Sequence, residues 1–135
     1  MNSMEENIEM EKAFLAVTDK AGAQDLLSTC KSEKVMFSTH NPDGLYNDVS
    51  KTCENLIGYT PKELIGTSPY DYFLPEDFQK ILKSHAKVTI RPEIDRVEYR
   101  IKMKDGNYKK VRSLSRQVKD PTGLELILVV TFDEE

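Results

Sequence analysis

The sequence predicts an α+β fold in a single domain, with an antiparallel sheet packed against helices. Residues 96–104 alternate between charged and apolar side chains, as an antiparallel strand does when one face is buried and the other solvated. Residues 54–77, ENLIGYTPKELIGTSPYDYFLPED, combine helix-capping residues with glycines and prolines, which indicates several short helices that change direction. A chain of 135 residues can bury a core without a metal or a disulfide.

The first elements are helical and form a segment of their own. An apolar stripe with loose helical spacing runs along it: Ile8, Phe14, Leu15 and Val17. We expect this helix to break near Gly22, and a second short helix to precede the first strand. The predicted organisation is therefore a helical cap over residues 1–33, a sheet domain over 34–133, and the start of a C-terminal linker at 134–135.

The next elements are two strands, the helical connector and a long helix. Residues 35–40 and 45–50 read as strands around the Asn-Pro-Asp-Gly turn at 41–44. In the connector, Thr60 and Glu63 form a capping box. The long helix follows Pro75, and one buried face is predicted from apolar side chains at helical spacing: Phe78, Ile81, Leu82 and His85.

The C-terminal third contains three strands. The strand at 96–104 ends in an Asp105-Gly106 hairpin turn. In the following strand Val111 has the opposite parity to Leu114, so we expect a bulge or register fault between these two residues.

The last strand is apolar on both faces and must therefore be covered on both. One face carries Leu124, Leu126, Leu128, Val130 and Phe132, and the other carries Ile127 and Val129. We expect Ile127 and Val129 to form the outer face of the sheet, covered by the N-terminal helix through Phe14 and Leu15 or by a second subunit.

The composition excludes several classes of protein. A net charge of -4 gives no overall attraction to nucleic acid or to an anionic membrane. Cys30 and Cys53 are far apart and suggest neither a disulfide framework nor a zinc site. The N-terminus is acidic, and the longest aliphatic run, residues 126–130, is too short to span a bilayer. We expect a cytoplasmic, intracellular protein that binds neither membrane nor nucleic acid.

Candidate catalytic groups are few. There is no Ser-His-Asp order, no phosphate-binding glycine loop and no cluster of metal ligands. Asp71, Glu76 and Asp77 could act as paired carboxylates, but we expect them to cap short helices, where a carboxylate favours the positive helix end. The sequence therefore predicts that the chain is not an enzyme and holds no metal.

Positive charge gathers in one hairpin. Residues 96–119 contain nine Lys or Arg against Glu98 and Asp105, a net charge of +7. This hairpin could dock an acidic partner or nucleic acid, or it could be a solvated surface whose edge lysines prevent aggregation. Aromatic residues are not interleaved on its charged face, which argues against base stacking and favours the solvated surface.

The order of these elements, with four sequence blocks at their spacing, resembles a PAS domain over about residues 35–133. The blocks are NPDGLYNDVS, NLIGYTPKELIG, LPEDF and EYRIKMKDGNYKKVRS, and they match the subgroup with the pattern GY-x-x-x-EL-x-G...PED. The resemblance implies a five-stranded antiparallel sheet in the order 2-1-5-4-3, with helices on one face around a small pocket and an N-terminal cap helix. It also implies a sensory or signal-transduction module that forms a homodimer and hands over to an effector domain or a regulatory protein partner.

Three functions remain open. The first is a sensor that binds a small ligand or metabolite, or a protein partner, and transmits the change through dimer contacts and its C-terminal exit. The second is a ligand-free interaction or homodimerisation domain of a kinase or transcriptional regulator. The third, with the least support, is a small enzyme or nucleic-acid binder that uses the basic hairpin at 96–119.

The residues that we expect around the pocket come from the connector, the long helix and the sheet. They are Tyr46, Ile57, Tyr59, Leu64, Phe78, Leu82, His85, Tyr99, Ile101, Leu114 and Leu128. The same side chains could instead be ordinary core, since a domain of this size must fill its interior.

The resemblance also bears on cofactors. Light-sensing members attack flavin with the cysteine of a GxNC motif, but here that position is Pro69, so no photoadduct can form. Haem-sensing members use a histidine on the long helix, for which His85 is the candidate, although an isolated histidine is more often part of the core or its rim. The subgroup's usual histidine and tryptophan are replaced here by Leu74 and Lys110. We expect no cofactor, with haem or non-covalent flavin as the alternatives.

Overall fold

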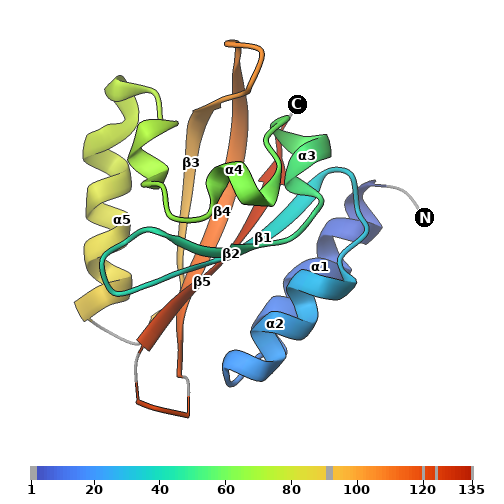
Figure 1. Ribbon diagram of the computed structural model, residues 1–135, viewed down its shortest axis with the longest axis vertical. Coiled ribbons are helices and arrows are strands. Elements are labelled where there is room, and N and C mark those ends of the chain that lie inside the picture. Colours follow the sequence, from blue (N-terminus) through green and yellow to red (C-terminus); the bar gives the residue numbers. More distant parts are fainter. Residues whose placement is uncertain (1–2, 91–92, 120, 124, 135) are drawn as a thin grey trace.

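A five-stranded sheet lies between two groups of helices (Figure 1). The computed structural model describes residues 3–90, 93–119, 121–123 and 125–134. The helices are α1 (Ser3–Ala16), α2 (Lys20–Thr29), α3 (Cys53–Leu56), α4 (Pro61–Leu64) and α5 (Phe78–Ile90), with 3-10 turns η1 (Pro69–Asp71) and η2 (Pro75–Asp77). The strands are β1 (Val35–His40), β2 (Tyr46–Val49), β3 (Asp95–Lys102), β4 (Tyr108–Lys119) and β5 (Glu125–Asp133).

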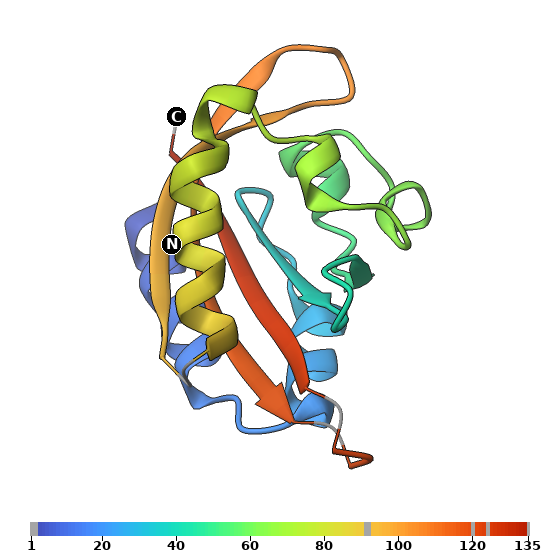
Figure 2. The same cartoon turned by 90° about the vertical axis from the view of Figure 1, so that its left-hand side faces the viewer.

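The strands pair antiparallel throughout, in the order β2-β1-β5-β4-β3. The last strand therefore occupies the centre of the sheet, between β1 and β4. Figure 2 shows α5 running across one face of the sheet, with α1 and α2 behind it. The predicted α+β fold, with this strand order and an N-terminal helix, is confirmed.

The N-terminal helices pack directly on the sheet. Phe14 of α1 and Leu27 of α2 are buried in one cluster with side chains of β1, β4 and β5. The break between the two helices lies before Asp19, whose side chain accepts a hydrogen bond from the Gly22 amide at 2.9 Å and so caps α2. The expected break near Gly22 is thus wrong by a few residues, because Gly22 lies within the first turn of α2.

The two faces of β5 are both covered, as predicted, but the side predicted for each set of residues is wrong. Leu128 packs beneath the N-terminal helices, together with Leu126, Val130 and Phe132. Ile127 and Val129 instead face α5 and line a cavity. Alternation identifies residues that share a face, but it carries no information about which helices cover that face. Leu124 lies outside the described residues.

Strand β4 pairs with both of its neighbours without a shift in register. The expected fault between Val111 and Leu114 is therefore wrong. Val111 packs in the cluster on the α5 side, whereas Leu114 and Val118 pack beneath the N-terminal helices. The change of apolar parity arises because β4, like β5, is buried between two helical layers.

The connector is held by the predicted capping box. The Glu63 amide donates to Thr60 Oγ1 at 3.2 Å, and the Thr60 amide donates to Glu63 Oε1 at 3.0 Å. Gly58, with φ +88°, ends α3 beside the β3–β4 hairpin, where an added Cβ would lie 3.2 Å from the Lys104 Cβ. The connector is thus fixed against the hairpin and over the sheet.

Among the described residues, no helix combines the length and apolar character that crossing a bilayer requires.

Candidate ligand-binding cavity

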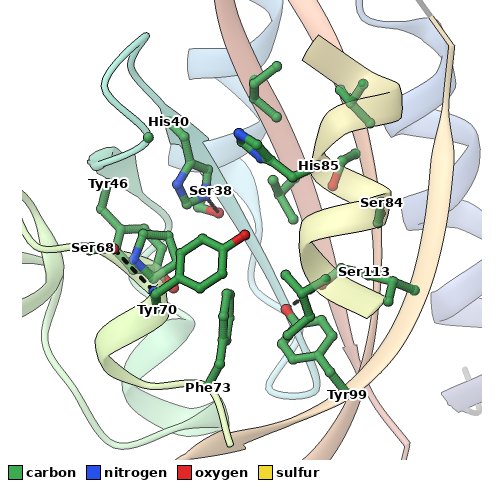
Figure 3. A pocket seen from close by; sticks show the side chains of 18 of the residues that line it. Ser38, His40, Tyr46, Ser68, Tyr70, Phe73, Ser84, His85, Tyr99 and Ser113 are labelled. Atoms are coloured by element: carbon green, nitrogen blue, oxygen red, sulfur yellow. Dashed lines mark hydrogen bonds between the residues drawn. The ribbon is translucent and has the colours of Figure 1, made fainter. Parts of the chain in front are cut away.

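A cavity of about 230 Å³ lies between α5, the connector and the sheet (Figure 3). Its apolar lining comes from Pro69, Phe73, Ile81, Leu82, Val88, Val97, Ile127 and Val129. Its hydroxyl groups come from Ser38, Tyr46, Ser68, Tyr70, Ser84, Tyr99, Ser113, Ser115 and Thr131. Small clefts with an apolar wall and a few convergent polar groups are the usual form of a ligand site.

The lining carries almost no charge. Among the described residues that line it, Asp43 is the ionisable side chain other than histidine and tyrosine, and it lies exposed in the β1–β2 turn. None of the lining residues in the described part of the chain is Lys or Arg. The described lining therefore offers hydrogen bonds and apolar contact but no buried counter-charge for an ion.

The floor of the cavity is a chain of hydroxyls across three neighbouring strands. Tyr99 Oη of β3 lies 2.7 Å from Ser113 Oγ of β4, which lies 2.8 Å from Thr131 Oγ1 of β5. All three side chains are buried. Burial raises the pKa of Tyr99 above its ordinary value, so the phenol is neutral. The floor is thus a connected, uncharged network that joins β3 to β5.

His40 closes one side of the cavity from the end of β1. Its Nε2 lies 3.0 Å from Ser38 Oγ, and its ring centroid lies 4.6 Å from that of Tyr46. Burial, together with the proximity of His85, lowers the pKa of His40 to about 4. The imidazole is therefore neutral at pH 7.

His85 lies on α5 at the rim of the cavity and is exposed. Partial desolvation lowers its pKa below the ordinary value.

The cavity volume lies below the roughly 300–1,000 Å³ of sites for drug-sized ligands, so the cavity has no room for haem or a flavin. Among the described residues, no three His, Cys, Asp or Glu side chains lie close enough to hold a metal ion.

Tyr70 of η1 directs a hydroxyl into the space between His40 and His85 (Figure 3). The ring is held edge-on by Phe73, with centroids 5.0 Å apart, and by Phe78, at 5.6 Å. Its Oη is buried and has no hydrogen-bond partner within the protein. Leaving a buried hydroxyl unpaired costs about 1–3 kcal/mol, so a hydrogen bond between this hydroxyl and a polar ligand atom would remove that cost.

The structure brings together some of the predicted pocket residues. Tyr46, Leu82, His85 and Tyr99 line the cavity. Ile57, Leu64 and Ile101 are buried in the adjoining core, and Tyr59 packs against that core. Phe78 lies behind Tyr70.

Leu114 and Leu128 do not belong to the cavity, and their predicted placement there is wrong. Both point to the opposite face of the sheet, beneath the N-terminal helices. On that face Phe14 is fully buried, as expected of a covering helix, whereas Leu15 is half-exposed.

Several lining residues were not predicted. His40 lies two residues after Ser38, its hydrogen-bond partner, and the pairing of β1 with β2 places it opposite Tyr46. Ser113 and Ser115 alternate with buried Leu114 in β4, and this pattern of small hydroxyl residues was the available signal of a cavity-facing side. Nothing local in the sequence identifies Tyr70.

The connector carboxylates do not form a catalytic pair. Asp77 is buried, and its carboxylate accepts hydrogen bonds from Arg100. Its expected role as a helix cap is replaced by this cross-connection to β3. Asp71 and Glu76 are exposed.

The basic hairpin is largely engaged in contacts within the chain. Ion pairs join Arg96 to Glu11, Arg100 to Asp77, Lys104 to Glu63, Lys109 to Asp133 and Arg112 to Glu134. Arg116 donates to the carbonyls of Phe14 and Leu15, which are in α1. These contacts attach the hairpin to the connector, to α1 and to the end of β5.

A family model described as "PAS fold" matches residues 46–131. The five-stranded sheet, the connector and the cavity beneath α5 fall largely within this match, and the chain belongs to the PAS fold family. The resemblance drawn from the sequence blocks is thereby confirmed.

Two relatives show how such a domain is placed in longer proteins. The chain is 31% identical over 97 residues to the protein Cycle of Drosophila melanogaster, an alignment that covers 71% of this chain and 24% of Cycle. It is 32% identical over 95 residues to human basic helix-loop-helix ARNT-like protein 1, covering 70% of this chain and 15% of that protein. The alignments thus span less than a quarter of either relative.

Solved structures agree with the fold. The Cycle PAS-B domain with bound ethylene glycol has a TM-score of 0.67 at 31% identity, covering 73% of this chain and 98% of that one. A PAS domain from Colwellia psychrerythraea has a TM-score of 0.65 at 20% identity, covering 73% and 85%. The second likeness shows the fold alone.

Proposed function

We propose that this chain is a PAS sensory module that binds a small molecule in the cavity beneath α5. The observation that carries the proposal is the buried, unpaired hydroxyl of Tyr70, which points into a cavity lined by apolar and hydroxyl groups. The Cycle PAS-B domain was solved with bound ethylene glycol, and a variant of it with bound glycerol. Binding of small uncharged molecules by that relative supports the same capacity here.

The proposed route of transmission runs through the sheet. The hydroxyl chain from Tyr99 to Thr131 connects the cavity floor with the C-terminal half of β5. The end of β5 is tied to β4, since Lys109 pairs with Asp133 at 3.2 Å and Arg112 with Glu134 at 2.9 Å. A ligand that prefers one packing of α5 on the sheet would shift the population of states at this exit by its differential affinity.

Native mass spectrometry and thermal unfolding with a panel of small metabolites test the sensor proposal. Val129→Phe places a ring in the cavity and should abolish any ligand-dependent rise in melting temperature. Leu15→Phe adds a ring at a half-exposed position of α1 and serves as the control. If no molecule stabilises the protein, or if Val129→Phe leaves the stabilisation unchanged, the sensor proposal fails.

A second candidate function is homodimerisation or partner binding through α1. Met4, Ile8 and Leu15 share one side of this helix and are 73%, 48% and 50% exposed. Such a stripe favours contact with another apolar surface. In sedimentation velocity, Ile8→Lys should lower the fraction of dimer, whereas Gln24→Lys, which adds the same charge at an exposed site of α2, should not. A wild-type protein that stays monomeric at high concentration would contradict this candidate.

We further propose that the module acts inside the cell as part of a kinase or transcriptional regulator. We also propose that it has no catalytic activity and does not bind nucleic acid. The internal ion pairs of the basic hairpin support the last point, because they engage the charges that would bind phosphates. A salt-dependent shift of a labelled duplex in an electrophoretic assay would contradict it.

A further inference from the structure

We propose that the cavity selects an uncharged molecule with one polar group, a hydroxyl or a carbonyl, which pairs with Tyr70 Oη while an apolar body lies against Phe73, Ile81 and Val129. This inference rests on the proposed function and adds the chemical class of the ligand. Tyr70 supplies the anchor because its hydroxyl is buried, unpaired and directed into the cavity. A phenol both donates and accepts a hydrogen bond, so it can pair with either group.

The residues that line the cavity disfavour a charged ligand. Among the residues that the structure describes, no Lys or Arg lines the cavity, and the carboxylate of Asp43 lies exposed in the β1–β2 turn. His40 is neutral at pH 7 and is already hydrogen-bonded to Ser38. An ion that entered would lose its hydration and gain no buried partner of opposite charge among the described residues. Uncharged molecules avoid that cost.

The paired hydroxyls of the cavity floor favour Tyr70 over the floor as the point of recognition. The hydroxyls of Tyr99, Ser113 and Thr131 are paired with one another along the floor. A ligand that took one of them would break an existing hydrogen bond, whereas pairing with Tyr70 breaks none. The polar group of the ligand therefore belongs at the Tyr70 side, between β1 and α5.

The apolar part of the site limits the shape of the ligand. The ring of Phe73 meets Tyr70 and Tyr99 edge to face, with centroids 5.0 Å from each. These rings, with Ile81 and Val129, form the walls of a space of about 230 Å³. That volume suits a molecule of fragment size, with a single ring or a short branched chain, rather than a drug-sized one.

Four probes of one shape test the inference: benzyl alcohol, benzoate, benzylammonium and toluene. Their dissociation constants are measured at pH 7.5 by NMR titration of the 15N-labelled chain. Benzyl alcohol should bind at least about tenfold more tightly than benzoate or benzylammonium. Tyr70→Phe should weaken benzyl alcohol about fivefold and leave toluene unchanged. Tyr108→Phe, at an exposed tyrosine of β4, is the matched control and should change neither.

The outcomes separate this inference from the proposed function. If benzoate or benzylammonium binds as tightly as benzyl alcohol, or if Tyr70→Phe has no effect, the ligand class is wrong and the sensor proposal stands. If none of the four probes shifts the cavity resonances, both are overturned. The comparison of charged and uncharged probes uses the wild-type chain and so does not depend on the folding of a variant.

Discussion

The carboxylate of Asp77 accepts three hydrogen bonds from Arg100. Oδ2 accepts from the backbone N–H at 2.8 Å and from Nε at 3.1 Å, and Oδ1 accepts from Nη2 at 2.8 Å. Asp77 directly precedes α5, and Arg100 lies in β3. This pair therefore fixes the start of α5 to the sheet and holds the roof of the cavity over its floor.

Replacing Asp77 by Asn should lower the free energy of unfolding by about 1.5–3 kcal/mol, because the charge-assisted hydrogen bonds are lost while the site stays buried. Urea denaturation measures the change. Glu76→Gln, at an exposed neighbour, should cost less than about 0.5 kcal/mol. Equal costs for the two variants would show that the contact with Arg100 does not hold α5.

A second prediction concerns the contribution of the hydroxyl chain on the cavity floor to stability. Ser113→Ala removes the central member and leaves the hydroxyls of Tyr99 and Thr131 buried without this partner, which should cost about 1–3 kcal/mol. Ser115→Ala, on the same face of β4, is the control and should change stability little. Adding Tyr99→Phe to Ser113→Ala should cost less than the sum of the single changes. Strict additivity would contradict coupling along the chain.

The N-terminal helices are predicted to contribute directly to the stability of the sheet. Phe14 is fully buried among Val118, Leu128 and their neighbours, so Phe14→Ala should cost about 3–5 kcal/mol. Leu15, the next residue, is 50% exposed, and Leu15→Ala should cost less than about 1 kcal/mol. Chemical denaturation of both variants checks the difference. Similar losses would show that α1 is not packed as described.

Stability should fall on acidification because His40 is buried as a neutral imidazole. Its pKa is about 4 in the folded state and 6.5 ordinarily, so below pH 6.5 the unfolded chain binds a proton that the folded chain does not. The stabilisation is thus complete above pH 6.5 and is lost as the pH falls to about 4, by up to about 3 kcal/mol.

The variants His40→Gln and His85→Gln test this interpretation in the same pH range. His40→Gln should remove most of the slope, whereas His85→Gln should remove less, since His85 is exposed. Asp77 acts in a lower range: hydrogen bonds from Arg100 lower its pKa below 3.8, so its contribution is lost only as the pH falls below that value. A wild-type stability that is flat between pH 6.5 and 4 would contradict the burial of His40.

Much of the fold could be predicted because its signals are local. The capping box of Thr60 and Glu63, the alternation of residues 96–104 and the turns between strands are each set by neighbouring residues, and the resemblance supplied the strand order. The facing of β4 and β5 could not be predicted in this way. Leu128 and Val129 are both apolar, and only the packing of α1 and α5 decides which of them meets the cavity.

The candidate site was harder to predict than the fold, because its residues are brought together by long-range packing. His40, Tyr70 and Ser113 come from β1, η1 and β4, and their side chains meet only when the connector folds over the sheet. None of these residues stands in a motif with its partners. The predicted residues that do line the cavity, such as Tyr99 and His85, were found from strand alternation and helix spacing.

The most direct test of the ligand-binding account is a methyl NMR titration of the wild-type chain with benzyl alcohol. Ile127 and Val129 face the cavity, whereas Leu126 and Leu128 of the same strand face the N-terminal helices. We predict that the methyl shifts of Ile81, Ile127 and Val129 move together with one dissociation constant, while those of Leu126 and Leu128 stay in place. Shifts centred on Leu126 and Leu128, or no shift at any of these methyl groups, would contradict a ligand site beneath α5.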